Sequence, residues 1–140
     1  MKVMVSACLM GRNCKYNGGN NRNQRLLYYI QETGSEVIEV CPERMGGLPT
    51  PRVPAEIVDG AVVNRDGVSV DLAFRAGARK ALDLAMREIP DLCVLQSRSP
   101  SCGVKEIYDG SFSGKLIPGH GIFADLLLRH GFCVKDIEDL

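Results

Sequence analysis

The chain has 140 residues, of which 45% are apolar, and this length and composition can build the core of one domain. Its 17 Lys and Arg residues balance its 17 Asp and Glu residues, so the charge favours small-molecule partners over a nucleic-acid duplex or a membrane surface. The first residues are strand-like rather than leader-like, and no apolar run approaches the roughly 20 residues of a membrane span, so we expect a cytoplasmic protein.

Four short apolar runs predict buried β-strands, and three amphipathic stretches between them predict helices. The strands are expected near residues 2–6, 36–41, 92–96 and 132–135, and the helices at 22–32, 71–88 and 121–129. Helical crossovers between consecutive strands require parallel strands with helices on both faces of the sheet. We therefore predict one α/β domain over residues 1–140, with three layers and a mainly parallel sheet of about four strands.

Long, irregular segments follow the predicted strands. Residues 8–21 are dense in Gly and Asn, which favour turns, and residues 41–54 contain four prolines and two glycines, which predict a rigid loop without regular structure. Residues 55–70 hold two Asp-Gly turns between β-branched runs and predict a small peripheral hairpin. Residues 97–103 and 108–115 are also rich in turn residues. Because parallel strands share a carboxyl edge, these loops are expected to meet there and form a site.

Six cysteines divide into groups by position. Cys8, Cys41 and Cys102 each lie at a strand end or in the loop that follows, and we interpret them as ligands. Cys93 and Cys133 lie inside apolar runs and are predicted to be buried packing residues away from the chemistry. A core-sized chain without a leader points to a reducing compartment, where clustered thiols bind metal or react rather than form disulfides.

Three thiolates without a nearby histidine suit a soft metal, either zinc or an iron–sulfur cluster. The close C-x-x-C pairs usual in structural zinc sites are absent, and this favours a cluster, whose ligands can be far apart in sequence. With three cysteine ligands, a four-iron cluster keeps one iron free to bind substrate as a Lewis acid. Cys14 lies in the first loop without a recognised ligand spacing, so a fourth-ligand role stays open.

Several motifs, in this order, resemble the 2-thiouracil desulfidase family over nearly the whole chain. They are Val5-Ser6-Ala7-Cys8-Leu9-Met10-Gly11, Lys15-Tyr16-Asn17-Gly18-Gly19, Val40-Cys41-Pro42-Glu43, Gly46-Gly47-Leu48-Pro49-Thr50-Pro51-Arg52, Ser99-Pro100-Ser101-Cys102-Gly103 and Ile107-Tyr108-Asp109-Gly110-Ser111-Phe112-Ser113-Gly114-Lys115. The family often has Arg and Asp where this chain has Lys15 and Asn17, and many members lack a cysteine at position 14.

The resemblance implies a Rossmann-like domain with a [4Fe–4S] cluster on Cys8, Cys41 and Cys102. It also implies a redox-neutral reaction on a thiolated nucleobase or nucleoside. The thiocarbonyl sulfur binds the open iron, water attacks the carbon, and sulfur leaves as sulfide. Because an amide cannot transfer protons, Asn17 in place of an acid could change the activity or the substrate.

The resemblance and the loop positions nominate the remaining site residues. Glu43, two residues past Cys41, is the candidate base for the attacking water; its alternative role is an exposed ion pair with Arg44 or Arg52. Ser99 and Ser101 flank Pro100 and either orient water or the cluster sulfurs, or cap the turn. The possible substrate-binding residues are Lys15, Tyr16, Asn17, Arg52 and Lys115.

Two other functions fit the same cysteines. In the first, Cys14 closes a four-thiolate site, and the protein is a non-catalytic zinc or iron–sulfur binding module. In the second, Cys102 or Cys14 is a reactive thiol of a redox or sulfur-carrier protein. Colour separates a cluster from the other cases, because protein purified anaerobically with a cluster is brown and protein with zinc or bare thiols is colourless.

Overall fold

A computed structural model describes all residues from 1 to 140, and four parallel strands form its central sheet. The strands are β1 (Lys2–Ser6), β2 (Glu36–Val40), β5 (Leu92–Leu95) and β8 (Val134–Asp136), in the order β2-β1-β5-β8. Every pairing in this sheet is parallel. The predicted parallel α/β sheet of four strands is therefore confirmed, with boundaries that differ by one or two residues.

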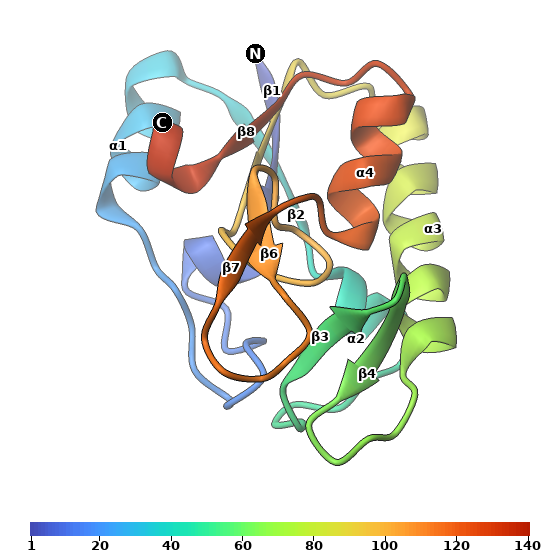
Figure 1. The fold of residues 1–140 in the computed structure, drawn as a ribbon. Coiled ribbons are helices and arrows are strands. Elements are labelled where there is room, and N and C mark those ends of the chain that lie inside the picture. The colour runs from blue at the N-terminus through green and yellow to red at the C-terminus, as the bar shows by residue number, and fades with distance from the viewer.

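Helices cover both faces of the sheet (Figure 1). Helix α1 (Gln24–Thr33) lies on one face, while α3 (Asp71–Glu88) and α4 (Ile122–Arg129) pack side by side on the other. Successive side chains of β1 alternate between the faces, as a strand requires. Val3 and Val5 join the core cluster that contains Leu26 of α1, and Met4 joins the cluster that contains Ala78 of α3.

Strand order reverses beside β1, and this reversal positions the site. The chain leaves β1, forms β2 on one side of it, and returns through α3 to form β5 on the other side. The loops after β1 and β5 therefore diverge in opposite directions at the carboxyl edge of the sheet. Open α/β sheets bind ligands in the crevice that such a reversal creates.

A short helix occupies the start of the segment 41–54, which we predicted to be an irregular loop, so that prediction was wrong for residues 42–45 and holds for residues 46–54. Helix α2 (Pro42–Met45) begins directly after Cys41, with Pro42 in its first turn, where the missing N–H of proline costs nothing. It packs against α3 through two glycines in backbone contact. A Cβ on Gly77 would lie 1.7 Å from the Pro42 carbonyl oxygen, and one on Gly46 would lie 2.0 Å from the Ala73 carbonyl oxygen. Tertiary packing, rather than local propensity, stabilises this helix.

Two hairpins lie outside the main sheet. Strands β3 (Ala55–Val58) and β4 (Ala61–Asn64) form the predicted hairpin, which is antiparallel. Strands β6 (Glu106–Tyr108) and β7 (Leu116–Pro118) form a second antiparallel hairpin, which we had read only as a turn-rich segment. Both hairpins lie toward the carboxyl edge of the sheet (Figure 1), so even the predicted peripheral hairpin adjoins the site region.

The two cysteines assigned to packing differ in burial. Cys93 in β5 is fully buried, as predicted, and burial raises its pKa to about 12. Cys133 is exposed, so its predicted burial was wrong. The edge strand β8 begins one residue later, at Val134, and Cys133 contributes its carbonyl oxygen, which accepts the Cys93 N–H at 2.8 Å.

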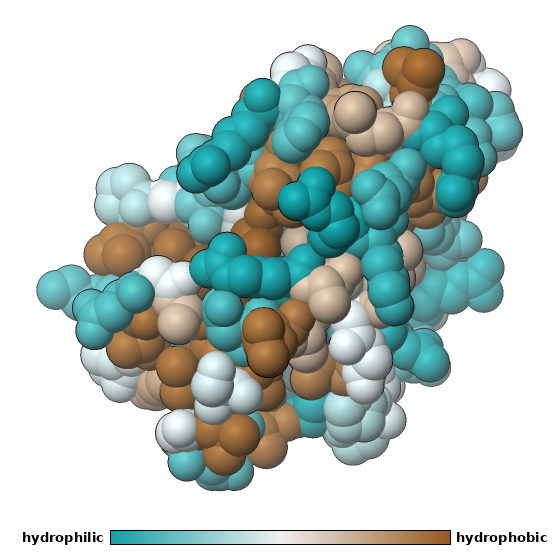
Figure 2. Space-filling model, turned by 90° about the vertical axis from the view of Figure 1, so that its right-hand side faces the viewer, coloured by the Kyte–Doolittle hydropathy of each residue, from teal (hydrophilic) through white to brown (hydrophobic).

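The outer surface of the α3 and α4 side mixes apolar and polar residues (Figure 2). The exposed apolar side chains of α3 and its C-cap are Leu72, Met86 and Ile89, which lie near opposite ends of the helix. Scattered apolar side chains are normal on a protein surface. No helix is both long enough and apolar enough to cross a lipid bilayer.

Asp71 connects the β3–β4 hairpin to α3, and its loss is expected to destabilise the fold. Its carboxylate accepts the Val62 N–H at 3.0 Å and pairs with Arg75 at 2.8 Å. Burial opposes ionisation, but these two contacts hold the pKa of Asp71 below its usual range. The stabilisation is therefore present above the unfolded carboxyl pKa and is lost as the pH falls through the folded one.

We expect Asp71→Ala to lower the free energy of unfolding by about 1 kcal/mol at neutral pH, with a smaller effect in acid. Urea denaturation of both proteins at several pH values measures this difference. Asp83→Ala, at an exposed position of the same helix, is the matched control and is expected to change stability little. An equal effect of the two substitutions would contradict the assignment.

Candidate functional site

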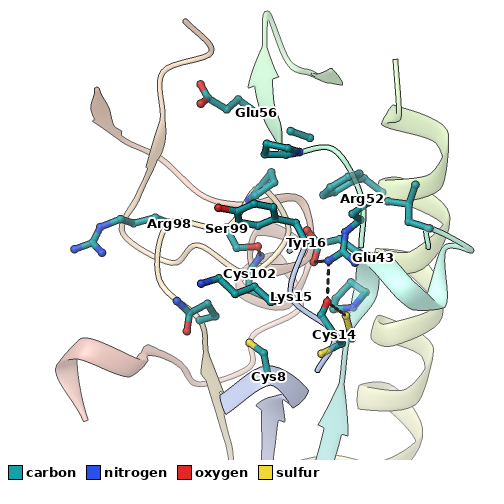
Figure 3. Close-up of a pocket in the computed structure, with 18 of the residues that line it drawn as sticks. Cys8, Cys14, Lys15, Tyr16, Glu43, Arg52, Glu56, Arg98, Ser99 and Cys102 are labelled. Carbon is teal, nitrogen blue, oxygen red and sulfur yellow. Dashed lines mark hydrogen bonds and ion pairs between the residues drawn. The ribbon is translucent and has the colours of Figure 1, made fainter. Parts of the chain in front are cut away.

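Four thiols line one cavity of about 800 Å³ at the carboxyl edge of the sheet. Figure 3 shows this cavity, with Cys8, Cys14 and Cys102 around its lower part and Glu56 at the opposite end. The thiol-bearing residues are Cys8, Cys14, Cys41 and Cys102. Loops after three parallel strands bring them together, as predicted from the strand ends, and both hairpins contribute to the walls.

Cys8 is positioned by a single 3₁₀ turn, η1 (Ala7–Met10), that begins directly after β1. Gly11 ends this turn with a φ of 95°, a left-handed conformation that glycine adopts without strain. The Asn21 backbone N–H donates to the Cys8 carbonyl oxygen at 3.0 Å, and its side-chain amide donates to Cys8 Sγ at 3.6 Å. Burial raises the pKa of Cys8, and the Asn21 hydrogen bond opposes this increase. Asn21 thus holds both the backbone and the sulfur of Cys8.

Cys41 lies beside Cys14, and the two thiols interact. A hydrogen bond from the Cys14 thiol lowers the pKa of Cys41 to about 7, although burial opposes it, and the pKa of Cys14 is raised. Cys41 Sγ also lies 3.9 Å from the Cys14 carbonyl oxygen. Cys14 is only 3% exposed, so it belongs to the cavity wall rather than to a freely moving loop. Cys14 therefore favours the thiolate form of Cys41, which is the form that binds metal.

Cys102 lies in a loop that is fixed against the start of α4. The Ser99 hydroxyl accepts the backbone N–H groups of Ser101 and Cys102, both at 3.1 Å. The Ile122 and Phe123 N–H groups donate to the carbonyl oxygens of Pro100 and Ser101. These contacts use the free N–H groups of a helix start to hold the loop in one shape.

The contact between this loop and α4 depends on a missing side chain. A Cβ on Gly121 would lie 2.5 Å from the Ser101 carbonyl carbon, so only glycine fits there. Burial raises the pKa of Cys102, while hydrogen bonds from Ser6 and Ser101 favour its thiolate. The Ser101 hydroxyl lies 3.7 Å from Cys102 Sγ. Each of the three predicted ligands therefore has its own polar partner.

Glu43 of α2 forms a buried ion pair in the cavity wall. Its carboxylate lies 3.2 Å from Arg52, with side chains that are 17% and 8% exposed. Burial raises the pKa of Glu43, whereas Arg52 and a hydrogen bond with Ser101 act to lower it. Arg52 also donates to the carbonyl oxygens of Cys14 (3.0 Å) and Pro49 (3.2 Å). The pairing partner suggested for Glu43 is present, but the pair faces the cavity instead of bulk solvent.

The remaining predicted site residues fall into two groups. Lys15 and Tyr16 line the cavity and lie close together, with the Lys15 ammonium 5.9 Å from the Tyr16 ring centre. Asn17 and Lys115 are exposed and are not among the cavity-lining residues. Asn17 instead accepts the Gly19 N–H at 2.9 Å and stabilises a turn. The amide at position 17 therefore has a structural contact that needs no acid.

Three further residues that line the cavity were not predicted from the sequence, namely Ser6, Asn21 and Glu56. Ser6 is the last residue of β1 and Asn21 lies among other asparagines, so neither differs from an ordinary strand or turn residue in the sequence. Glu56 lies in the predicted hairpin, which we placed at the periphery. The only signal for these residues in the sequence was their position near a strand end or in a long loop. Their hydrogen-bond partners are remote in sequence, so the contacts themselves could not be predicted.

The donor set fits an iron–sulfur cluster. The ligating atoms are sulfurs, as such clusters require, and each of Cys8, Cys41 and Cys102 receives a hydrogen bond that favours its thiolate. The four thiols come from positions far apart in sequence, and the ligands of a cluster can be separated in this way.

Fold and site together define a class: an α/β domain with a thiol-rich site at the reversal of strand order. Comparison with known proteins identifies the family within that class. A family model described as 2-thiouracil desulfurase matches residues 3–139, and the chain belongs to this family.

Two relatives match almost the whole chain. An uncharacterised protein of Bacillus subtilis (strain 168), YbbK, is 37% identical over 148 residues, which cover 99% of this chain and 97% of YbbK. A solved structure, described as the [4Fe–4S]-dependent thiouracil desulfidase TudS, superposes with a TM-score of 0.92 at 38% identity. That match covers 99% of this chain and 92% of TudS.

Proposed function

We propose that this protein is a [4Fe–4S]-dependent desulfidase that converts a thiolated pyrimidine into its oxo form and releases sulfide. The substrate class is a thiouracil-type base or nucleoside. One observation carries the proposal: Cys8, Cys41 and Cys102 share a cavity with the ion pair of Glu43 and Arg52. Family membership and the likeness to TudS support the same activity. Because free thiols and such a cluster need reducing conditions, we place the protein in the cytoplasm.

The proposed reaction is a hydrolysis in which a thiocarbonyl and water give a carbonyl and hydrogen sulfide, with no net oxidation or reduction. When bound by Cys8, Cys41 and Cys102, the cluster supplies an iron without a protein ligand, which acts as a Lewis acid toward sulfur. Its three protein ligands come from different loops of one sheet edge, so the fold holds them around the same space.

Glu43 accepts the proton of the attacking water in this proposal. Its carboxylate is buried in the cavity wall, and burial raises its pKa, which strengthens it as a base once it is ionised. Arg52 keeps the carboxylate oriented at 3.2 Å, and the Ser101 hydroxyl bonds to Glu43 as well as lying near Cys102. Ser101 thus connects the base to the thiol end of the cavity.

Serine, lysine and tyrosine side chains complete the proposed site. Ser99 acts mainly on the loop, because its hydroxyl holds two backbone N–H groups that position Cys102. Lys15 and Tyr16 line the cavity and are the proposed contacts to the pyrimidine, where an aromatic ring can stack and an ammonium can meet a carbonyl oxygen. Arg52 is committed to Glu43 and to two carbonyl oxygens, so we assign it to positioning rather than to substrate.

A second candidate is a non-catalytic module whose cluster has four thiolate ligands. The observation that favours it is the burial of Cys14 beside Cys41, inside the same cavity. A fourth thiolate would occupy the iron that the desulfidase needs for its substrate. Activity therefore distinguishes the two functions directly.

The test is anaerobic reconstitution with iron and sulfide, followed by incubation with 2-thiouracil, 4-thiouracil and 2-thiouridine. We expect brown protein, loss of the thiocarbonyl absorbance, and sulfide in the medium. Protein without iron is the control and is expected to be inactive. A brown protein that turns over none of these compounds would favour the four-thiolate module.

A further inference from the structure

Glu56 attaches the loop between β6 and β7 to the other hairpin. Its Oε1 accepts two backbone N–H groups of that loop, from Gly110 at 3.0 Å and from Phe112 at 3.1 Å. The two N–H groups, from alternate residues of the loop, converge on one oxygen of a carboxylate that belongs to the protein itself. Glu56 therefore connects β3 to the tip of the second hairpin by two hydrogen bonds.

The loop adopts a backbone shape that needs such support. Phe112 has a φ of 57°, in the left-handed region that a residue with a large side chain rarely occupies. Gly110 approaches β3 so closely that a Cβ there would lie 2.7 Å from the Ile57 carbonyl oxygen. Within the loop, Asp109 accepts from Ser111, but this bond does not connect the loop to another element. The Glu56 carboxylate supplies that connection.

The same loop forms part of the cavity wall. Glu56, Tyr108, Phe112 and Gly114 line the cavity that contains the four thiols. In Figure 3, Glu56 lies at the end opposite Cys8, with Tyr16 between them. A pyrimidine whose sulfur faces the thiols therefore directs its far side, or the sugar it carries, toward the wall that Glu56 holds.

We propose that Glu56 is a positioning residue that fixes the 109–114 loop as the outer wall of the substrate cavity. This inference rests on the proposed desulfidase function and assigns a source of substrate selectivity to it. The wall contacts the part of the substrate that projects away from the thiocarbonyl. Loss of the carboxylate frees the loop, so it weakens binding of a nucleoside more than binding of a free base and leaves the chemical step intact.

The test compares Glu56→Ala and Glu56→Gln with Glu32→Ala, an exposed glutamate on α1. The readouts are hydrogen exchange of residues 109–114, iron content, and KM and kcat for 2-thiouracil and 2-thiouridine. For Glu56→Ala we expect faster hydrogen exchange of the loop and an unchanged iron content. The KM for 2-thiouridine is expected to rise about tenfold, the effect that corresponds to the loss of one or two hydrogen bonds. Glu56→Gln keeps an acceptor oxygen and is expected to lie between Glu56→Ala and the unchanged protein.

A second variant keeps the inference testable if Glu56→Ala does not fold. Phe112→Gly removes the aromatic wall while accepting the positive φ, and it is expected to raise the KM for 2-thiouridine more than that for 2-thiouracil. Unchanged loop exchange in the Glu56 variants would overturn the positioning role, whatever the activity. Faster exchange with an equal effect on both substrates would overturn the selectivity. An inactive parent protein would instead refute the proposed function, and hydrogen exchange would still decide the role of Glu56.

Discussion

Each of Cys8→Ser, Cys41→Ser and Cys102→Ser is expected to abolish iron binding and sulfide release, whereas Cys14→Ser keeps most of both. A serine hydroxyl is a poor ligand for iron, so loss of any one of the three ligands leaves the cluster incompletely held. Cys14 acts on Cys41 through a hydrogen bond, and a serine hydroxyl can donate a similar bond. Cys14→Ser therefore preserves the environment of Cys41.

Iron content, visible absorbance and sulfide release of the four variants, all prepared anaerobically, measure this difference. Cys93→Ser is the matched control, because Cys93 is buried in β5 and does not line the cavity. It is expected to lower stability without a specific loss of iron. Equal loss of iron from all four cavity variants would make Cys14 a ligand and contradict an open iron.

Glu43→Gln is expected to reduce kcat by about 10²–10⁴-fold while the iron content stays unchanged. Glutamine has nearly the same shape as glutamate but cannot accept the proton of water. A base works only when it is deprotonated, and burial raises the pKa of Glu43. The pH profile of kcat is therefore expected to have an acidic limb, in which activity rises with pH, at a higher pH than an ordinary glutamate would give. That limb is expected to disappear from the residual activity of Glu43→Gln.

Glu39→Gln is a matched control for charge, because Glu39 of β2 pairs with the exposed Arg12 and does not line the cavity. Its activity and pH profile are expected to match those of the unchanged protein. An acidic limb that persists in Glu43→Gln, with nearly normal kcat, would show that another group activates the water. Loss of iron in this variant would instead assign Glu43 a structural role.

The sheet and the three cysteines were predictable because both follow from short apolar runs and what comes after them. A parallel strand that ends in Cys8 or Cys41 must present that residue at the carboxyl edge, whatever the details of the loop. Helix α2 was missed because its stability comes from backbone contact between Gly46 and Gly77, two positions remote in sequence. A local sequence pattern cannot predict a contact between positions so far apart.

The hydrogen-bond partners within the site could not be predicted from local sequence patterns either. Arg52, which lies 38 positions after Cys14, donates to the Cys14 carbonyl oxygen at 3.0 Å. Glu56 and Phe112 are 56 positions apart and meet only because two hairpins converge. The expectation that Cys133 is buried failed for a related reason, because the apolar run around it continues into an edge strand that begins at Val134.

The most direct test of the proposed chemistry is the balance between sulfide released and oxo-pyrimidine formed, measured anaerobically without added reductant or oxidant. Hydrolysis at an open iron predicts equal amounts of the two products over many turnovers. It also predicts that oxygen from labelled water appears in the pyrimidine. Sulfide limited to that of the cluster itself, or turnover only with an added reductant, would contradict a redox-neutral desulfidase.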